Sequence, residues 1–211
     1  MFSTDRDILS LEPSVFSDVA IAAQQRLSVT DGVLSGTTLT SSAADFEAAQ
    51  VQAGGVVLID DVPHEVVARV DANTLTVSLL RTDRDDPPIP STNGANHDVV
   101  VRTFGPQIAV VHAMLLRMLG IDSDDPSCGL DAGAVLSVEV MRQLETLGTL
   151  ERIYSGAVAL AGDSVPALHK ATEYRRRFRA ALSSATVLLD LDGDGVADVR
   201  RHMGVHRLVR R

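Results

Sequence analysis

The chain has 211 residues, of which 45% are apolar and 22% charged, and its formal net charge is −9. This composition is typical of a soluble globular protein of one large or two small domains. The acidic balance argues against general affinity for the nucleic-acid backbone, because that affinity comes from basic side chains that neutralise phosphates. The single cysteine, Cys128, excludes an internal disulfide, and no apolar run is long enough to predict a membrane helix.

Residues 5–28 are predicted to be helical. Asp5 or Asp7 is suited to cap a first turn, and Pro13 suits the first position of a second helix that begins near Glu12. Apolar residues recur at spacings of three and four from Val15 onward. We therefore expect residues 1–32 to form the N-terminal helical segment of a bundle.

From Val33 the apolar period changes to two, which is typical of strands. Short β-branched runs separated by Gly, Asp, Asn and Pro predict strands around Leu39 and at residues 56–59, 65–70, 74–79 and 97–102. A short helical turn is expected at residues 42–50. Strands of this length and spacing predict a small antiparallel β-barrel over residues 33–104, inserted after the first helix.

The helical period returns at Gly105, and residues 105–185 are predicted to form the rest of the bundle. Three amphipathic segments span residues 108–119, 136–154 and 166–182, with Asp131 as a cap for the second. Residues 186–211 are predicted to form a β-hairpin and a basic tail. The predicted fold class is thus α+β: a bundle of about four helices, an inserted small antiparallel β-barrel and a C-terminal β-hairpin.

Charge is unevenly placed along the chain. Residues 170–211 hold ten Lys and Arg against five Asp and Glu, which leaves −14 on residues 1–169. Such polarity favours head-to-tail contact between copies or docking to an acidic neighbour, and the simpler alternative is a solvated arginine face on one helix. The interaction residues that we predict from this pattern are Arg175, Arg179, Arg207, Arg210 and Arg211.

The sharpest local motif is the aspartate-rich segment 190–198. Its carboxylates match positions 1, 3, 5 and 9 of an EF-hand-like calcium loop, with Gly195 at position 6. The match ends at position 12, where Arg201 replaces the bidentate glutamate, and strand-like sequence flanks the loop. A plain hairpin turn is the alternative. If the loop binds metal, calcium is the only cofactor expected, and its ligands are Asp190, Asp192, Asp194 and Asp198.

A resemblance to a known class of proteins rests on the N-terminal half. The segments DRDILSLEP (5–13), GTTLT (36–40), DFEAA (45–49), VQAGGVVLID (51–60) and VPHEVV (62–67) resemble the small β-modules of tailed-phage virion proteins. Helices around such a module resemble the head–tail connector proteins, also called adaptor or neck proteins. The resemblance covers about residues 5–180 and transfers no functional residue.

The resemblance implies a structural virion protein located in the neck and assembled in the host cytoplasm. Its partners would be copies of itself in a ring, the portal protein, and tail or neck proteins. An acidic lumen would let packaged DNA pass without specific binding, because like charges repel. No membrane partner and no catalytic residue are expected, so the chain is predicted not to be an enzyme. The alternatives are a calcium-binding module that uses the 190–198 loop and an enzyme of unrecognised type.

Overall fold

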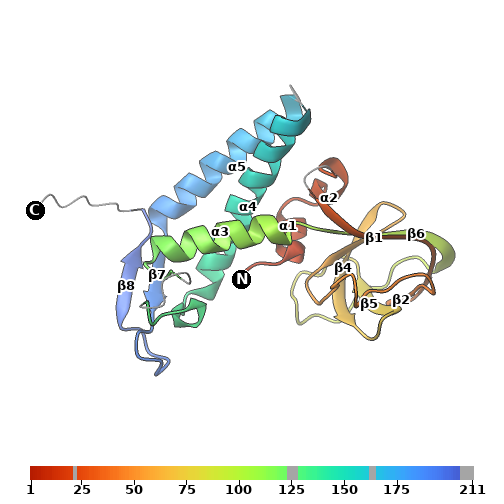
Figure 1. Cartoon of the computed structure of the whole chain (residues 1–211), viewed down its shortest axis with the longest axis horizontal. Coiled ribbons are helices and arrows are strands. Elements are labelled where there is room, and N and C mark those ends of the chain that lie inside the picture. The colour runs from red at the N-terminus through yellow and green to blue at the C-terminus, as the bar shows by residue number, and fades with distance from the viewer. Residues whose placement is uncertain (21–22, 123–127, 162–164, 205–211) are drawn as a thin grey trace, which may run out of the picture. The chain divides into compact units, whose positions relative to one another are not determined.

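The computed structural model describes residues 1–20, 23–122, 128–161 and 165–204 (Figure 1). The fold is α+β, with a closed antiparallel barrel, five α-helices and a two-stranded hairpin in the described part of the chain. The chain divides into two compact units. One is Thr4–Gly105, and the other combines Met1–Ser3 with Pro106–Arg211.

The barrel unit contains six strands in the order β1-β2-β5-β4-β3-β6, and every neighbouring pair is antiparallel. Their bounds are β1 (Gln24–Ser35), β2 (Thr38–Thr40), β3 (Val56–Ile59), β4 (Val62–Arg69), β5 (Thr74–Ser78) and β6 (Gly94–Thr103). Alternate side chains fill the interior with Leu34, Leu39, Phe46, Val57, Ile59, Val66, Leu75, Val77, Val99 and Val101. The predicted barrel and five of its strands are therefore present.

The sixth strand, β1 (Gln24–Ser35), begins inside the predicted helix: its residues 24–28 were predicted to be helical, and only 33–35 lie in the predicted barrel. The predicted helix over residues 5–28 is replaced by α1 (Asp5–Leu11), the single turn α2 (Val15–Asp18) and then β1. Strand β1 pairs with β6 from Gln24 to Leu34 and with β2 from Val33 to Ser35, so it closes the barrel. These ladder hydrogen bonds with both neighbours outweigh the local helical spacing of the apolar residues.

The loop between β2 and β3 contains one helical turn, within the residues 42–50 where a short helical turn was predicted. In it the amide of Ala49 donates to the carbonyl of Asp45 at 3.0 Å. Phe46 lies at its centre and is fully buried in the barrel interior. The segment therefore covers an end of the core rather than forming a helix.

Helix α1 is attached to the barrel by buried charges. Glu65 on β4 is fully buried, and its two carboxylate oxygens accept from Nε of Arg6 and Nε of Arg81. Arg6 also donates to the carbonyl of Arg81 at 2.9 Å. Two cations share one anion here, which satisfies the carboxylate and fixes α1 against β4.

The second unit contains α3 (Gly105–Met118), α4 (Val138–Ala161) and α5 (Val165–Ser184), all three of which were predicted. Figure 1 shows α4 and α5 as a long antiparallel pair. A Cβ at Gly148 of α4 would lie 2.9 Å from Val111 of α3 and 3.1 Å from the Phe178 ring of α5. The three helices thus meet closely at a residue without a side chain. Helices α1 and α2 belong to the barrel unit, whereas the sequence predicted that the N-terminal segment belongs to the helical bundle.

The C-terminal hairpin consists of β7 (Thr186–Leu189) and β8 (Val199–His202). Asp131 caps the short 3-10 helix η1 (Ala132–Ala134) instead of α4, and its side chain accepts from the amide of Gly133 at 2.7 Å. Beside η1, the amide of Asp190 donates to the carbonyl of Ala134 at 2.9 Å, which binds the end of β7 to this segment. Within the described residues, no helix combines the length and apolar character needed to cross a membrane.

Candidate functional site

Three features of the described residues are candidates for function, and the first is the aspartate loop between β7 and β8. Ligand oxygens of Asp190, Asp192 and Asp194 lie within 4.8 Å of one another. The carboxylate of Asp190 accepts from the amides of Gly193 and Gly195, each at 2.7 Å, and both glycines have positive φ. These hydrogen bonds, with that from Gly195 the largest effect, hold the pKa of Asp190 below its ordinary value. The loop therefore gathers three carboxylate ligands of the type that calcium prefers.

The other two positions of the calcium motif do not join this group. The carboxylate of Asp198 accepts from the amide of Leu191 at 2.7 Å, and Asp198 is not among the three clustered aspartates. Arg201, at the position of the missing glutamate, donates to the carbonyl of Leu119 at the end of α3. The structure thus brings together three of the four predicted ligands, and the side chain at position 12 turns to a structural contact.

The second candidate is the arginine face of α5. Arg175 and Arg179 are exposed, as predicted, together with Arg176 between them. Arg175 forms an ion pair with Glu151 of α4 at 3.0 Å, and Arg176 forms a pair with Glu173 at 2.8 Å. In the described part of the chain Arg179 has no ion-pair partner. The predicted interaction residues Arg207, Arg210 and Arg211 lie outside the described residues.

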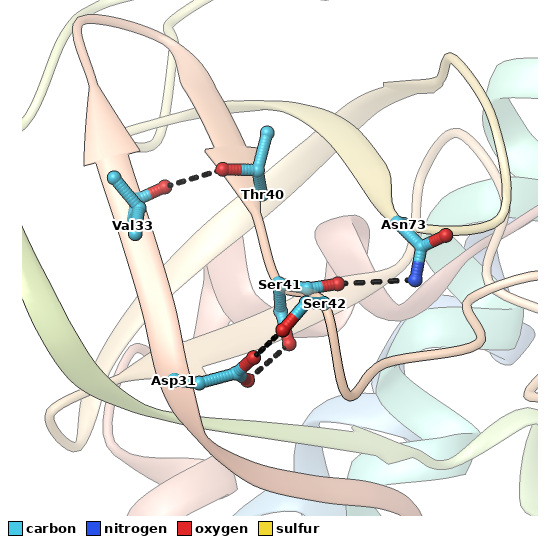
Figure 2. Close-up of a pocket in the computed structure, with 6 residues that line it drawn as sticks. All are labelled: Asp31, Val33, Thr40, Ser41, Ser42 and Asn73. Atoms are coloured by element: carbon cyan, nitrogen blue, oxygen red, sulfur yellow. Dashed lines mark hydrogen bonds between the residues drawn. The ribbon is translucent and has the colours of Figure 1, made fainter.

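The third candidate is an open hollow of about 480 Å³ in the barrel unit (Figure 2). It is formed where β1 and β2 meet the loops that follow β2 and β4, and its lining residues are Asp31, Val33, Thr40, Ser41, Ser42 and Asn73. The side chain of Asn73 donates to the carbonyl of Ser41 at 3.1 Å, which joins the two loops. Hydrogen bonds therefore hold the shape of the hollow.

Asp31 supplies the charge of this hollow. Its carboxylate accepts from the hydroxyl of Ser41, from the hydroxyl of Ser42 at 2.7 Å and from the amide of Ala43 at 3.0 Å. The hydrogen bonds from Ser41 and then Ser42 lower the pKa of Asp31 to about 2. The carboxylate is consequently ionised at neutral pH, and its half-buried position faces the hollow.

The two units differ sharply in charge. Thr4–Gly105 contains 15 Asp and Glu against six Arg, whereas the second unit contains 13 of each sign, so the whole net charge of −9 lies on the barrel unit. Its described surface exposes ten carboxylates but only one arginine, Arg26. The other five arginines are buried or half-buried. The barrel unit is therefore acidic on its outside, whereas α5 is basic.

Sequence reasoning found the aspartate loop and the α5 arginines but missed the hollow. Asp31, Ser41 and Asn73 come from three separate turn-forming stretches, which the sequence marks only as breaks between elements. Their convergence depends on the closure of the barrel by β1, whose first residues (24–28) were predicted to be helical. No short stretch of the sequence therefore indicates that these residues line one hollow.

Comparison with known proteins identifies no relative. No family model matches the chain, and no curated protein or solved structure does.

Proposed function

We propose that this protein is a ring-forming structural subunit of the head–tail connector of a tailed phage, located between portal and tail. The observation that carries the proposal is the presence of two unlike surfaces on one chain, an acidic barrel unit and a helix with an exposed arginine face. A ring requires heterologous contacts, in which one face of a subunit fits a different face of the next. Opposite charges on the two faces would set that order and accelerate assembly.

The closed barrel is consistent with such a role. All six strands pair with two neighbours, so copies cannot join by adding strands to a barrel edge. Association of the barrel unit must instead use side chains, and these are mostly acidic. An acidic barrel surface in a ring lumen would also repel DNA phosphates, so packaged DNA would pass without specific binding.

The α4–α5 pair offers a second kind of contact surface. Leu160 near the end of α4 is 65% exposed, and Val165 and Leu168 at the start of α5 are 73% and 55% exposed. Apolar side chains this exposed gain free energy when a partner covers them, at about 25 cal/mol per Å². We assign this end of the helix pair to contacts with portal, tail or neck proteins.

Co-expression with its partners tests the proposal. The neighbouring reading frames should encode portal, capsid and tail proteins, and the chain should be produced alone and together with the encoded portal and tail proteins. Negative-stain imaging and mass photometry should then show rings of this chain, free or seated on the portal. A protein that stays monomeric alone and with both partners would contradict the connector role.

The second candidate function is calcium binding by the 190–198 loop, and the clustering of three carboxylates within 4.8 Å favours it. Like charges at this separation repel, so a divalent cation would stabilise the loop. Calorimetry should detect calcium binding by the wild type and its loss in Asp192→Ala and Asp194→Ala. The exposed aspartate Asp85, on another loop, provides the control Asp85→Ala. An absence of binding by the wild type would end this candidate.

A further inference from the structure

Further acidic residues lie on the loops that line the hollow around Asp31. Asp45 and Glu47 follow the lining residues Ser41 and Ser42, and Asp71 precedes Asn73 by two residues. The amide of Phe46 donates to the carbonyl of Ala72 at 2.6 Å, so the two loops lie side by side. Asp45, Glu47 and Asp71 are all exposed, and they flank the hollow with negative charge.

Little positive charge balances these carboxylates. Glu47 has a long ion pair, in which Nη2 of Arg69 lies 3.9 Å from its Oε1, and Arg26 donates to the side chain of Gln50 on the same loop at 3.0 Å. Within the described residues, the hydrogen-bond donors to Asp31 are all neutral: the hydroxyls of Ser41 and Ser42 and the amides of Ser42 and Ala43. These donors use most of the lone-pair sites of Asp31, so Asp31 contributes negative charge to the hollow. The exposed carboxylates of Asp45, Glu47 and Asp71 offer the lone pairs for a cationic donor.

The occupant that fits this chemistry is an arginine side chain. Its planar guanidinium binds carboxylates through two parallel hydrogen bonds and is more weakly hydrated than an ammonium group. The carbonyl and hydroxyl groups of the lining can accept its remaining N–H donors. An open hollow of about 480 Å³ has room for more than one such side chain.

The same chain supplies such arginines on α5. Arg175, Arg176 and Arg179 are all exposed, and Arg179 follows Arg176 by three residues and Arg175 by four, so the three form one stripe along the helix. Arg179 is the one of the three without an ion-pair partner among the described residues. We propose that the hollow around Asp31 on one copy, drawn in Figure 2, binds the arginine stripe of α5 on a second copy.

This inference rests on the proposed function and names the two surfaces of its subunit contact. Each copy carries one hollow and one stripe, so each can bind two neighbours and the contact propagates from copy to copy. The contact is largely electrostatic. It therefore weakens as salt shortens the range of charge interactions.

A charge exchange tests the contact in the full-length protein. Glu47→Lys on the rim of the hollow and Arg179→Glu on α5 should each weaken self-association by roughly tenfold or more in Kd, measured by sedimentation velocity over a range of concentrations. The double variant should recover most of the wild-type affinity, because the two charges are exchanged rather than lost. Asp31→Asn should weaken association in the same way, and its folding is checked by far-UV circular dichroism.

The controls reverse equally exposed charges elsewhere. Asp85→Lys lies on the loop after β5, and Arg152→Glu lies on α4, and both should leave association unchanged. Assembly of rings that is insensitive to Glu47→Lys and Arg179→Glu, or a double variant no better than the singles, would overturn the inference but not the connector role. Failure of the wild type to assemble with or without portal and tail proteins would overturn both.

Discussion

Nδ1 of His112 on α3 lies 2.8 Å from a carboxylate oxygen of Glu145 on α4, and Glu145 is completely buried. The other carboxylate oxygen accepts from the amide of Ser3 at 2.9 Å and from its hydroxyl at 2.8 Å. One buried anion thus joins α3, α4 and the first residues of the chain. Its partners are all polar groups that would be costly to leave unpaired.

Glu145→Ala is expected to destabilise the helical unit by roughly 3 kcal/mol, because several buried donors lose their acceptor together. Both tyrosines of the chain, Tyr154 and Tyr174, lie in this unit, so tyrosine fluorescence during urea unfolding reports its stability. The matched control is Glu139→Ala, an exposed glutamate one turn and a half earlier in α4, with an expected change within about 0.5 kcal/mol. Equal effects of the two substitutions would contradict the role assigned to Glu145.

Glu65→Ala is expected to destabilise the barrel unit by roughly 3–5 kcal/mol, because Arg6 and Arg81 would remain buried without their shared anion. Hydrogen exchange of peptides from β4 and α1 measures the loss locally. Glu47→Ala removes a glutamate whose contact with Arg69 is exposed and long, and it should change barrel stability little. Unchanged protection of α1 in Glu65→Ala would refute the proposed attachment.

Asp5 gives the barrel unit an unusual pH dependence. Burial raises the pKa of Asp5 to about 6, despite hydrogen bonds from Thr103 and the amide of Phe104 that lower it. The folded state therefore binds a proton more tightly than the unfolded state does, so the contribution of Asp5 to stability falls as pH rises through about 6. A pKa raised from 3.8 to about 6 corresponds to a contribution of about 3 kcal/mol to the free energy of unfolding, which is present at low pH and lost at high pH.

Asp5→Asn should abolish that contribution. Urea unfolding followed by circular dichroism at about pH 4.5 and pH 7 should show about 2 kcal/mol of it as the difference between wild type and variant, because the unfolded carboxyl is already largely ionised at pH 4.5. Burial lowers the pKa of His64 and gives the opposite trend, but His64 is present in both proteins and its effect cancels in this difference. Parallel pH profiles for the two proteins would show that Asp5 does not titrate in this range.

Two glycines of α4 should respond to alanine with opposite signs. Gly148→Ala forces a Cβ against Val111 and Phe178 and should destabilise the helical unit by roughly 1–3 kcal/mol. At Gly156 an added Cβ meets nothing within 4 Å, so Gly156→Ala should stabilise the helix by up to about 1 kcal/mol. Tyrosine fluorescence in urea compares both variants, and a shared sign would contradict the packing described.

Periodic patterns predicted most of the fold because each reflects burial on one side of an element. The alternation around Val99 and Val101 and the three-and-four spacing along α3, α4 and α5 correspond to faces that are buried in the structure. The first residues of β1, 24–28, were predicted as helix because Leu27 continues the helical spacing of Val15 and Val19. The pairing that makes them a strand involves residues of β6 about 70 positions later. Local patterns carry no information on such pairing.

The charged clusters were beyond prediction for the same reason. Arg6, Glu65 and Arg81 come from three distant segments, and nothing in the spacing of charges indicates that they share a buried site. The aspartate loop was found because its aspartates all lie within one stretch of nine residues, 190–198. Its geometry differs from the motif at Asp198 and Arg201, because strands rather than helices flank the loop.

The hydrogen bonds from Thr103 and Phe104 to Asp5 bring the entry and exit of the barrel unit together. Met1–Ser3 and the chain from Pro106 belong to the same unit, the one that contains α3, α4 and α5. The barrel unit is therefore an insertion into that helical unit, and the two chain segments that connect it lie next to each other. Excision of residues 4–105 with a short glycine linker between Ser3 and Pro106 therefore leaves no long gap to span. The barrel unit is therefore the part of the chain that can be replaced by a barrel of different surface charge without changing the sequence of the helical unit.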